Sequence, residues 1–161
     1  MHLAVDVDTG EIVACVLTDD AGQVPALLDQ VEGEIASVAA DGAYDGEPVY
    51  RAIANHQPDR PPDVVIPPRA TAVVSTGDFE AQSQRDRHIR LIAEKGRMAW
   101  QKATGYGRRS LAETAVGRYK GIIGPKLRAR MLPAQQSEAA IAAEALNRMI
   151  RVAKPVSIRV A

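Results

Sequence analysis

The sequence predicts an α/β fold in which helices flank a mixed sheet. Residues 35–40 and 63–68 are short apolar runs, and residues 47–56 between them have a helical pattern. Strand, helix and strand in this order imply a parallel βαβ unit, because parallel strands need a long crossover connection. Residues 3–7 and 11–17 are β-branched apolar runs joined by a short polar turn. We therefore expect an antiparallel hairpin at the start of the chain.

Apolar spacing predicts a helix between the hairpin and the βαβ unit. Residues 23–34 carry Val and Leu three, four and seven positions apart, which is typical of an amphipathic helix. Residues 69–86 are rich in Thr, Ser, Gly and Gln and have no sustained periodicity, so we expect a mobile connection there.

The rest of the chain is predicted to be mainly helical. Breaks are expected near Gly96 and Gly105, followed by a well-defined helix over residues 106–123. A last helix is expected over residues 138–152, with Ser137 as its N-cap.

Composition limits the class of protein. With 161 residues and 46% apolar content, the chain can build one core, and only 4% of its residues are aromatic. Cys15 is the only cysteine, which excludes an internal disulfide. The N-terminus has no signal-peptide pattern, and no apolar run reaches the roughly 18 residues that a membrane span needs. We expect a cytoplasmic protein.

A formal net charge of zero hides a strong local asymmetry. Residues 85–130 contain 13 Lys or Arg against three acidic residues, a balance of +10. The remaining chain therefore holds 7 basic and 17 acidic residues, a balance of −10. A local positive field suits a polyanion such as DNA, since neutralised phosphates release their counterions. A solvated basic helix face is the alternative explanation.

Asp41 stands where the first strand of the predicted βαβ unit ends. Ligand sites on parallel sheets gather at the carboxyl ends of strands, so Asp41 is a candidate site residue. Asp45 lies four residues later and could reach the same loop, but Asp45-Gly46 is more simply the turn before the next helix.

Four polar residues share one stripe of the predicted 106–123 helix at about 100° per residue. They are Tyr106, Arg109, Glu113 and Lys120. The apolar face of this predicted helix consists of Leu111, Ala115, Tyr119 and Ile122. A glutamate among cations suits a phosphodiester held beside a metal ion. An ordinary solvated face with an Arg109–Glu113 pair, worth a few tenths of a kcal/mol, explains the same pattern.

The spacing of these residues resembles a known signature. Tyr106, two residues, Arg109, three residues, Glu113, six residues and Lys120 resemble the Tyr-Arg-Glu-Lys signature of bacterial insertion-sequence transposases with a DDE active site. Further segments resemble core segments of the same enzymes, at residues 2–14, 40–45, 65–69, 85–89 and 96–106. The resemblance covers essentially the whole chain.

The resemblance implies an RNase H-like fold in which two aspartates and one glutamate bind two divalent ions, normally Mg²⁺ and alternatively Mn²⁺. Asp41 would be the second aspartate and Glu113 the glutamate. Tyr106, Arg109 and Lys120 would contact the DNA of the transposon ends. The implied reaction is metal-dependent cleavage at element ends followed by strand transfer.

The chain departs from the family at the first aspartate. The family's first strand, which carries that residue, precedes the segment resembled here by residues 2–14. Asp6 and Asp8 are weak substitutes, because they fall in the segment resembling the second strand and in its turn. We therefore expect residues 1–153 to form a partial catalytic domain lacking its first strand, residues 154–161 to form a tail, and the isolated chain to be inactive.

The expected partners follow from the same resemblance. They are transposon-end DNA, a second copy of the chain, and an upstream fragment or full-length transposase, within a bacterial cytoplasm and at the nucleoid. The alternative is a non-catalytic remnant that binds DNA or a transposase.

Lesser features have competing explanations. His88 lies among arginines, where a phosphate contact and an idle position are equally plausible. Trp100 is expected to anchor a helix in the core rather than to stack on a flipped base. Lys126, Arg128 and Arg130 cluster in a predicted loop, which suggests contacts with the DNA backbone.

Overall fold

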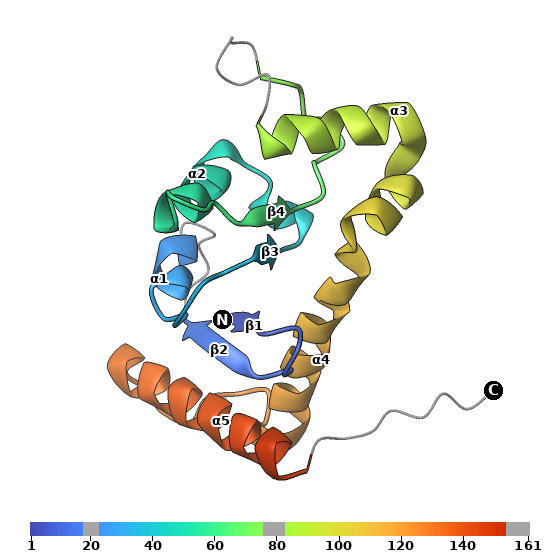
Figure 1. Ribbon diagram of the computed structural model, residues 1–161. Helices are drawn as coiled ribbons and strands as arrows, with labels where there is room; N and C mark the ends of the chain where they lie inside the picture. Colours follow the sequence, from blue (N-terminus) through green and yellow to red (C-terminus); the bar gives the residue numbers. More distant parts are fainter. Residues whose placement is uncertain (18–22, 76–82, 154–161) are drawn as a thin grey trace, which may run out of the picture. The chain divides into compact units, whose positions relative to one another are not determined.

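A computed structural model describes residues 1–17, 23–75 and 83–153. The chain divides into two compact units (Figure 1). Unit 1 combines Met1–Asp19 with Ser110–Ala161, and unit 2 is the continuous segment Asp20–Arg109. The predicted tail at residues 154–161 lies outside the described residues. Within the described ranges, no helix is long and apolar enough to cross a bilayer.

Unit 1 begins with the predicted hairpin. Strand β1 (His2–Val5) pairs antiparallel with β2 (Ile12–Val16). Gly10 has φ of +78° in the turn, and the Asp6 carboxylate accepts the Asp8 amide at 2.8 Å. Glycine adopts this positive φ without a steric cost, so the sequence of the turn explains the hairpin.

Helices cover this hairpin through small side chains. Helix α4 (Ser110–Arg118) packs on β1, and α5 (Leu132–Val152) packs on β2 (Figure 1). The buried cluster of unit 1 consists of Ile12, Ala115, Tyr119, Ala142, Ala143 and Leu146. Three of its six members are alanines, whose small side chains let the helix backbones approach the sheet closely.

Helix α5 starts earlier than the sequence predicts. It begins at Leu132, with Pro133 in its first turn, rather than at residue 138. Ser137 is therefore not an N-cap, and its hydroxyl donates to the Pro133 carbonyl at 3.1 Å. Proline suits the first turn of a helix because its φ is fixed and its missing N–H needs no partner there.

Residues 106–123 do not form one regular helix. Tyr106–Arg109 form the 3₁₀ turn η3, α4 follows, and Tyr119–Ile123 form a π-helical turn, η4. A helical wheel drawn at about 100° per residue does not describe either irregular turn, because 3₁₀ and π-helices do not have the roughly 3.6 residues per turn of an α-helix. The predicted apolar face is wrong in part: Ala115 and Tyr119 are buried, while Leu111 is 36% and Ile122 is 53% exposed.

Unit 2 contains the predicted parallel βαβ arrangement. Strand β3 (Ser37–Ala39) pairs parallel with β4 (Asp63–Val65), and helix α2 (Glu47–His56) connects them. A short helix, α1 (Val24–Leu28), packs beside α2 (Figure 1). The buried cluster of this unit consists of Val24, Leu28, Tyr50, Ile53, Val64 and Ile66.

Helix α1 is shorter than the predicted range of 23–34. It ends at Leu28, and the Gln57 side chain then accepts the Ile35 amide at 2.6 Å. This contact from the C-cap of α2 fixes the chain on its way into β3. The predicted range also includes Gly33, whose φ of +88° is not compatible with a continuing helix.

Helix α3 (Gln84–Thr104) confirms both predicted glycine breaks. Gly96 has non-helical angles (φ 82°, ψ 162°), and Gly105 ends the helix in the left-handed region with φ of 66°. Ser83 caps the helix by accepting the Asp86 amide. The predicted connection at residues 69–86 therefore extends too far into the helix, and its part at 76–82 lies outside the described residues.

Candidate active site

Asp41 lies immediately after β3, at the carboxyl end of the parallel pair. The Ala40 amide still bonds the Val65 carbonyl at 3.3 Å, and the chain then turns into the 3₁₀ helix η2 (Gly42–Tyr44). Asp41 caps this turn, because its Oδ1 accepts the Ala43 amide at 2.8 Å. The side chain is exposed, so its carboxylate is accessible to a cation.

Asp45 is buried and serves a different purpose from Asp41. It stands in the predicted turn before α2, yet only 5% of the residue is exposed. Arg85 bonds it with two nitrogens, Nε to Oδ1 at 2.6 Å and Nη2 to Oδ2 at 3.1 Å, and the Arg69 amide donates to Oδ2 at 2.9 Å. The hydrogen bond to Asp45 raises the pKa of Arg85. Asp45 thus accepts hydrogen bonds from Arg85 and Arg69 and is not exposed to a cation as Asp41 is.

His88 is a structural residue, contrary to both alternatives drawn from the sequence. The indole N–H of Trp100 donates to Nδ1 of His88 at 2.8 Å, so Nε2 carries the proton and donates to the Val64 carbonyl at 2.7 Å. Burial lowers the pKa of His88. Trp100 is fully buried, which confirms that it anchors the helix.

Tyr106 and Arg109 lie together on η3. The Tyr106 ring packs on Trp100 with centroids 5.1 Å apart, and the Arg109 guanidinium lies 5.6 Å from the Tyr106 centroid. This distance allows a cation–π contact. Tyr106 is thus held against the buried indole, and Arg109 lies over the Tyr106 ring.

Glu113 and Lys120 belong to unit 1. Glu113 is exposed in the first turn of α4, and Lys120 is exposed in η4. The neighbouring Arg118 is directed to the hairpin, where it donates to the Gly10 carbonyl at 2.7 Å. Asp41 lies in unit 2, so the two candidate carboxylates belong to different units.

The carboxylates suit a hard divalent ion, because Mg²⁺ prefers oxygen ligands. In residues 1–17, 23–75 and 83–153, no three His, Cys, Asp or Glu side chains gather into a group that could hold a metal. Asp41 and Glu113 are each accessible, and their donor atoms fit such an ion. A third carboxylate is needed to complete the set that the resemblance implies.

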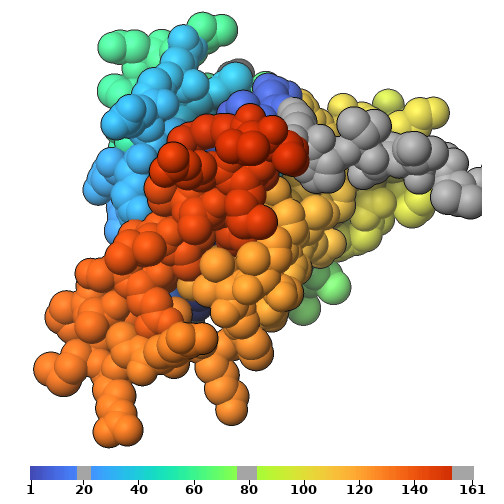
Figure 2. All heavy atoms as spheres, turned by 90° about the horizontal axis from the view of Figure 1, so that it is seen from below, coloured from blue at the N-terminus to red at the C-terminus, as the bar shows by residue number. Residues whose placement is uncertain are grey.

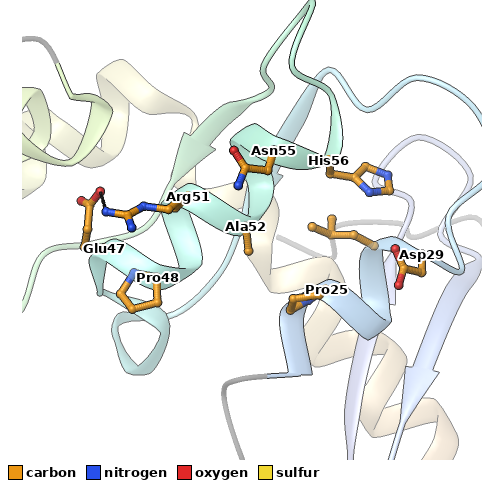
Figure 3. Close-up of a pocket in the computed structure, with 9 residues that line it drawn as sticks. Pro25, Asp29, Glu47, Pro48, Arg51, Ala52, Asn55 and His56 are labelled. Carbon is orange, nitrogen blue, oxygen red and sulfur yellow. Dashed lines mark hydrogen bonds and ion pairs between the residues drawn. The ribbon is translucent and has the colours of Figure 1, made fainter.

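An open groove lies elsewhere in unit 2, between α1 and α2 (Figure 3). It has a volume of about 710 Å³, and its lining includes Asp29, Glu47, Arg51 and His56. None of the candidate site residues lines it. The groove therefore gives no information about the carboxylate chemistry.

The fold and these residues define an α/β protein that presents exposed carboxylates and basic segments. A family model described as a transposase DDE domain matches residues 1–148, and the chain belongs to that family. Its role is accordingly in DNA transposition, and DDE transposases generally use divalent metal ions. No solved structure matches the chain. The individual roles of Asp41, Glu113, Tyr106, Arg109 and Lys120 stay predictions.

Proposed function

We propose that this chain supplies the second aspartate and the glutamate of a site for metal-dependent DNA cleavage and strand transfer at insertion-sequence ends. The observation that carries the proposal is the position of Asp41, exposed and hydrogen-bonded to Ala43 at the end of a parallel strand, in a chain matched by the DDE family over residues 1–148. Asp41 and Glu113 would hold two Mg²⁺ or Mn²⁺ ions. Such ions supply the charge that stabilises the attacking and leaving oxygens.

The proposed DNA contacts come from both units. Tyr106 and Arg109 would meet the transposon end from η3, where the ring and the guanidinium already pack together. Lys120 would contribute from η4. A guanidinium and an ammonium both bind phosphate, the first with a forked geometry and the second as a point charge.

We further propose that the third carboxylate is not among these 161 residues and that the isolated chain is inactive. Asp6 lies in the hairpin segment that resembles the family's second strand rather than its first, so we do not propose it as the missing ligand. Each described sheet has only two strands, β1 with β2 and β3 with β4, which is compatible with an RNase H-like sheet that needs another strand. Residues 1–153 would form the partial catalytic domain and act at the nucleoid, with a second copy or an upstream fragment as partner.

A non-catalytic role is the second candidate function. The basic balance of residues 85–130 supports DNA binding that needs no metal. A chain of this kind would occupy transposon ends or associate with a complete transposase.

Nicking of supercoiled DNA carrying the element's ends tests the proposal. We expect no cleavage by the chain alone in Mg²⁺ or Mn²⁺, and cleavage when the upstream segment is added. Asp41→Asn and Glu113→Gln should each abolish that restored cleavage, while Asp29→Asn, an exposed control, should not.

Other results would change the conclusion. Cleavage by the chain alone that depends on Glu113 would contradict the proposed inactivity and return attention to Asp6. Restored cleavage that survives Asp41→Asn would remove Asp41 from the site. Tight DNA binding without cleavage under any of these conditions would favour the non-catalytic role.

A further inference from the structure

The loop that carries Asp41 is held by an arginine from the other end of the βαβ unit. Arg69 follows β4, and its guanidinium donates from Nε to the Gly42 carbonyl at 3.3 Å and from Nη2 to the Ala43 carbonyl at 3.0 Å. Two consecutive carbonyls of η2 are thus bound by one planar group, whose nitrogens have a fixed separation.

One of these carbonyls shares a peptide plane with the amide that orients Asp41. The Gly42 carbonyl and the Ala43 N–H belong to the same rigid peptide group. Arg69 holds the oxygen side of that plane, and Asp41 Oδ1 accepts the N–H at 2.8 Å on the other side. Rotation of the plane would weaken both hydrogen bonds together.

The anchor of Arg69 is itself fixed in the core of unit 2. Its backbone amide donates to Asp45, which is 5% exposed and is bonded by two nitrogens of Arg85. The loop also approaches the strand end closely, since a Cβ on Gly42 would lie 3.2 Å from the Pro67 carbonyl oxygen. A backbone held on several sides has little freedom to reorient.

We infer that Arg69 is a positioning residue for Asp41: it locks the Gly42–Ala43 peptide plane whose N–H fixes the carboxylate in the orientation that receives the cation. The inference rests on the proposed function of Asp41 as a metal ligand. Hydrogen bonds that orient a ligand typically change metal affinity by about 10-fold to 100-fold when they are removed.

Arg69 is well suited to a test because its side chain is exposed. Arg69→Ala removes the guanidinium but keeps the backbone amide that bonds Asp45. Asp45 therefore keeps its partners in the variant, so the fold should persist. Arg69→Lys keeps the charge but cannot bind both carbonyls with a planar fork.

The experiment uses the full chain and two NMR measurements. Hydrogen exchange of the Ala43 amide reports on the peptide plane, and Mn²⁺ titration followed by paramagnetic broadening at residues 41–44 reports on cation binding. In Arg69→Ala we expect faster exchange at Ala43 and a Mn²⁺ midpoint raised about tenfold. Arg69→Lys should fall between Arg69→Ala and the wild type, with an unchanged thermal midpoint in both variants.

Arg51→Ala is the matched control, because Arg51 is an exposed arginine of the same unit. It should leave exchange at Ala43 and the Mn²⁺ midpoint as they are. Wild-type exchange and midpoint in Arg69→Ala would overturn the inference, and so would an equal effect in Arg51→Ala. If Mn²⁺ fails to broaden residues 41–44 in the wild type, cation binding by Asp41 in the isolated chain is refuted, while exchange at Ala43 still decides whether Arg69 locks the plane.

Discussion

The environment of His88 favours the neutral imidazole. Its Nδ1 accepts from Trp100, so a proton on this nitrogen would remove the hydrogen bond of a fully buried indole. Burial is the largest cause that lowers its pKa, and the nearby Arg87 acts in the same direction. The neutral ring is therefore part of the packing around β4 rather than a phosphate-binding group.

The stability of unit 2 should consequently fall at acidic pH. The folded pKa of His88 lies below its ordinary value of about 6.5, so the unfolded chain binds the proton more readily. His88 makes its full contribution to the free energy of unfolding above about pH 6.5, and this contribution is lost as the pH falls below that value. We expect denaturant melts followed by Trp100 fluorescence to show this loss between about pH 7 and pH 5.

His88→Phe serves as the comparison for that pH dependence. At neutral pH it should cost about 1–3 kcal/mol, because it leaves the Trp100 N–H without its acceptor. The difference in stability between wild type and variant should shrink as the pH falls. A difference that is constant with pH would show that His88 does not titrate on unfolding.

The buried pair of Asp45 and Arg85 should matter more than any exposed pair. The Asp45 side chain is 0% exposed and that of Arg85 is 17% exposed. Asp45→Asn should lower the free energy of unfolding by about 3–5 kcal/mol, since it leaves a largely buried cation without its partner. Glu47→Gln removes an exposed ion pair with Arg51. In a urea melt, this variant should change the free energy of unfolding by less than about 1 kcal/mol.

The residues around Asp41 show what sequence can and cannot predict. The position of Asp41 follows from an apolar strand that ends just before it, which is a local pattern. The burial of Asp45 depends on Arg85, 40 positions away, and on the amide of Arg69. No spacing or composition signal connects these three residues. Their association becomes visible only when the βαβ unit has folded.

At the level of elements, Asn147 joins α5 to the hairpin of unit 1. The residue is 6% exposed, and its amide bonds both the N–H and the carbonyl of Ile12 at 2.8 Å. Asn147→Ala should cost about 2–4 kcal/mol, because two buried backbone groups lose their partners. Asn147→Asp can replace only the acceptor and should also destabilise unit 1. Amide exchange at Ile12 in both variants checks whether the destabilisation is local to this site.

The position of Ser137 gives a test of where α5 begins. Replacing a true N-cap serine with alanine lowers the free energy of unfolding by about 1 kcal/mol. Ser137 lies within the helix and donates to Pro133, so Ser137→Ala should change stability by no more than about 0.5 kcal/mol. If a urea melt shows that Ser137→Ala lowers the free energy of unfolding by about 1 kcal/mol, the result would favour a helix that starts at residue 138.

The elements that the sequence predicts correctly are those fixed by local chemistry. Examples are the hairpin turn ending at Gly10 and the breaks at Gly96 and Gly105, all with positive φ. The end of α1 and the π-helical turn η4 depart from a regular α-helical period, so periodicity alone does not find them. The same limit applies to the signature residues, which a regular helix would align but which the structure distributes over η3, α4 and η4.

For the whole molecule, the distribution of charge is the property most relevant to DNA. Lys126, Arg128 and Arg130 are exposed in the segment that precedes α5, within the basic range 85–130. The Glu138 carboxylate accepts the amides of Arg128 at 2.9 Å and Ala129 at 2.8 Å, and these bonds lower its pKa. The backbone of this basic segment is thereby tied to α5, which lies toward the viewer in Figure 2.

Replacing these three cations with alanine should weaken DNA binding and its dependence on salt. The slope of log K against log salt should decrease in magnitude by about 0.9 for each phosphate that is no longer neutralised, with little dependence on DNA sequence. The same number of exposed arginines outside the basic range, Arg51, Arg60 and Arg148, provides the control. An unchanged slope in the control and a smaller one in the triple variant would place phosphate contacts on the segment. Equal changes in both would mean that net charge alone governs binding.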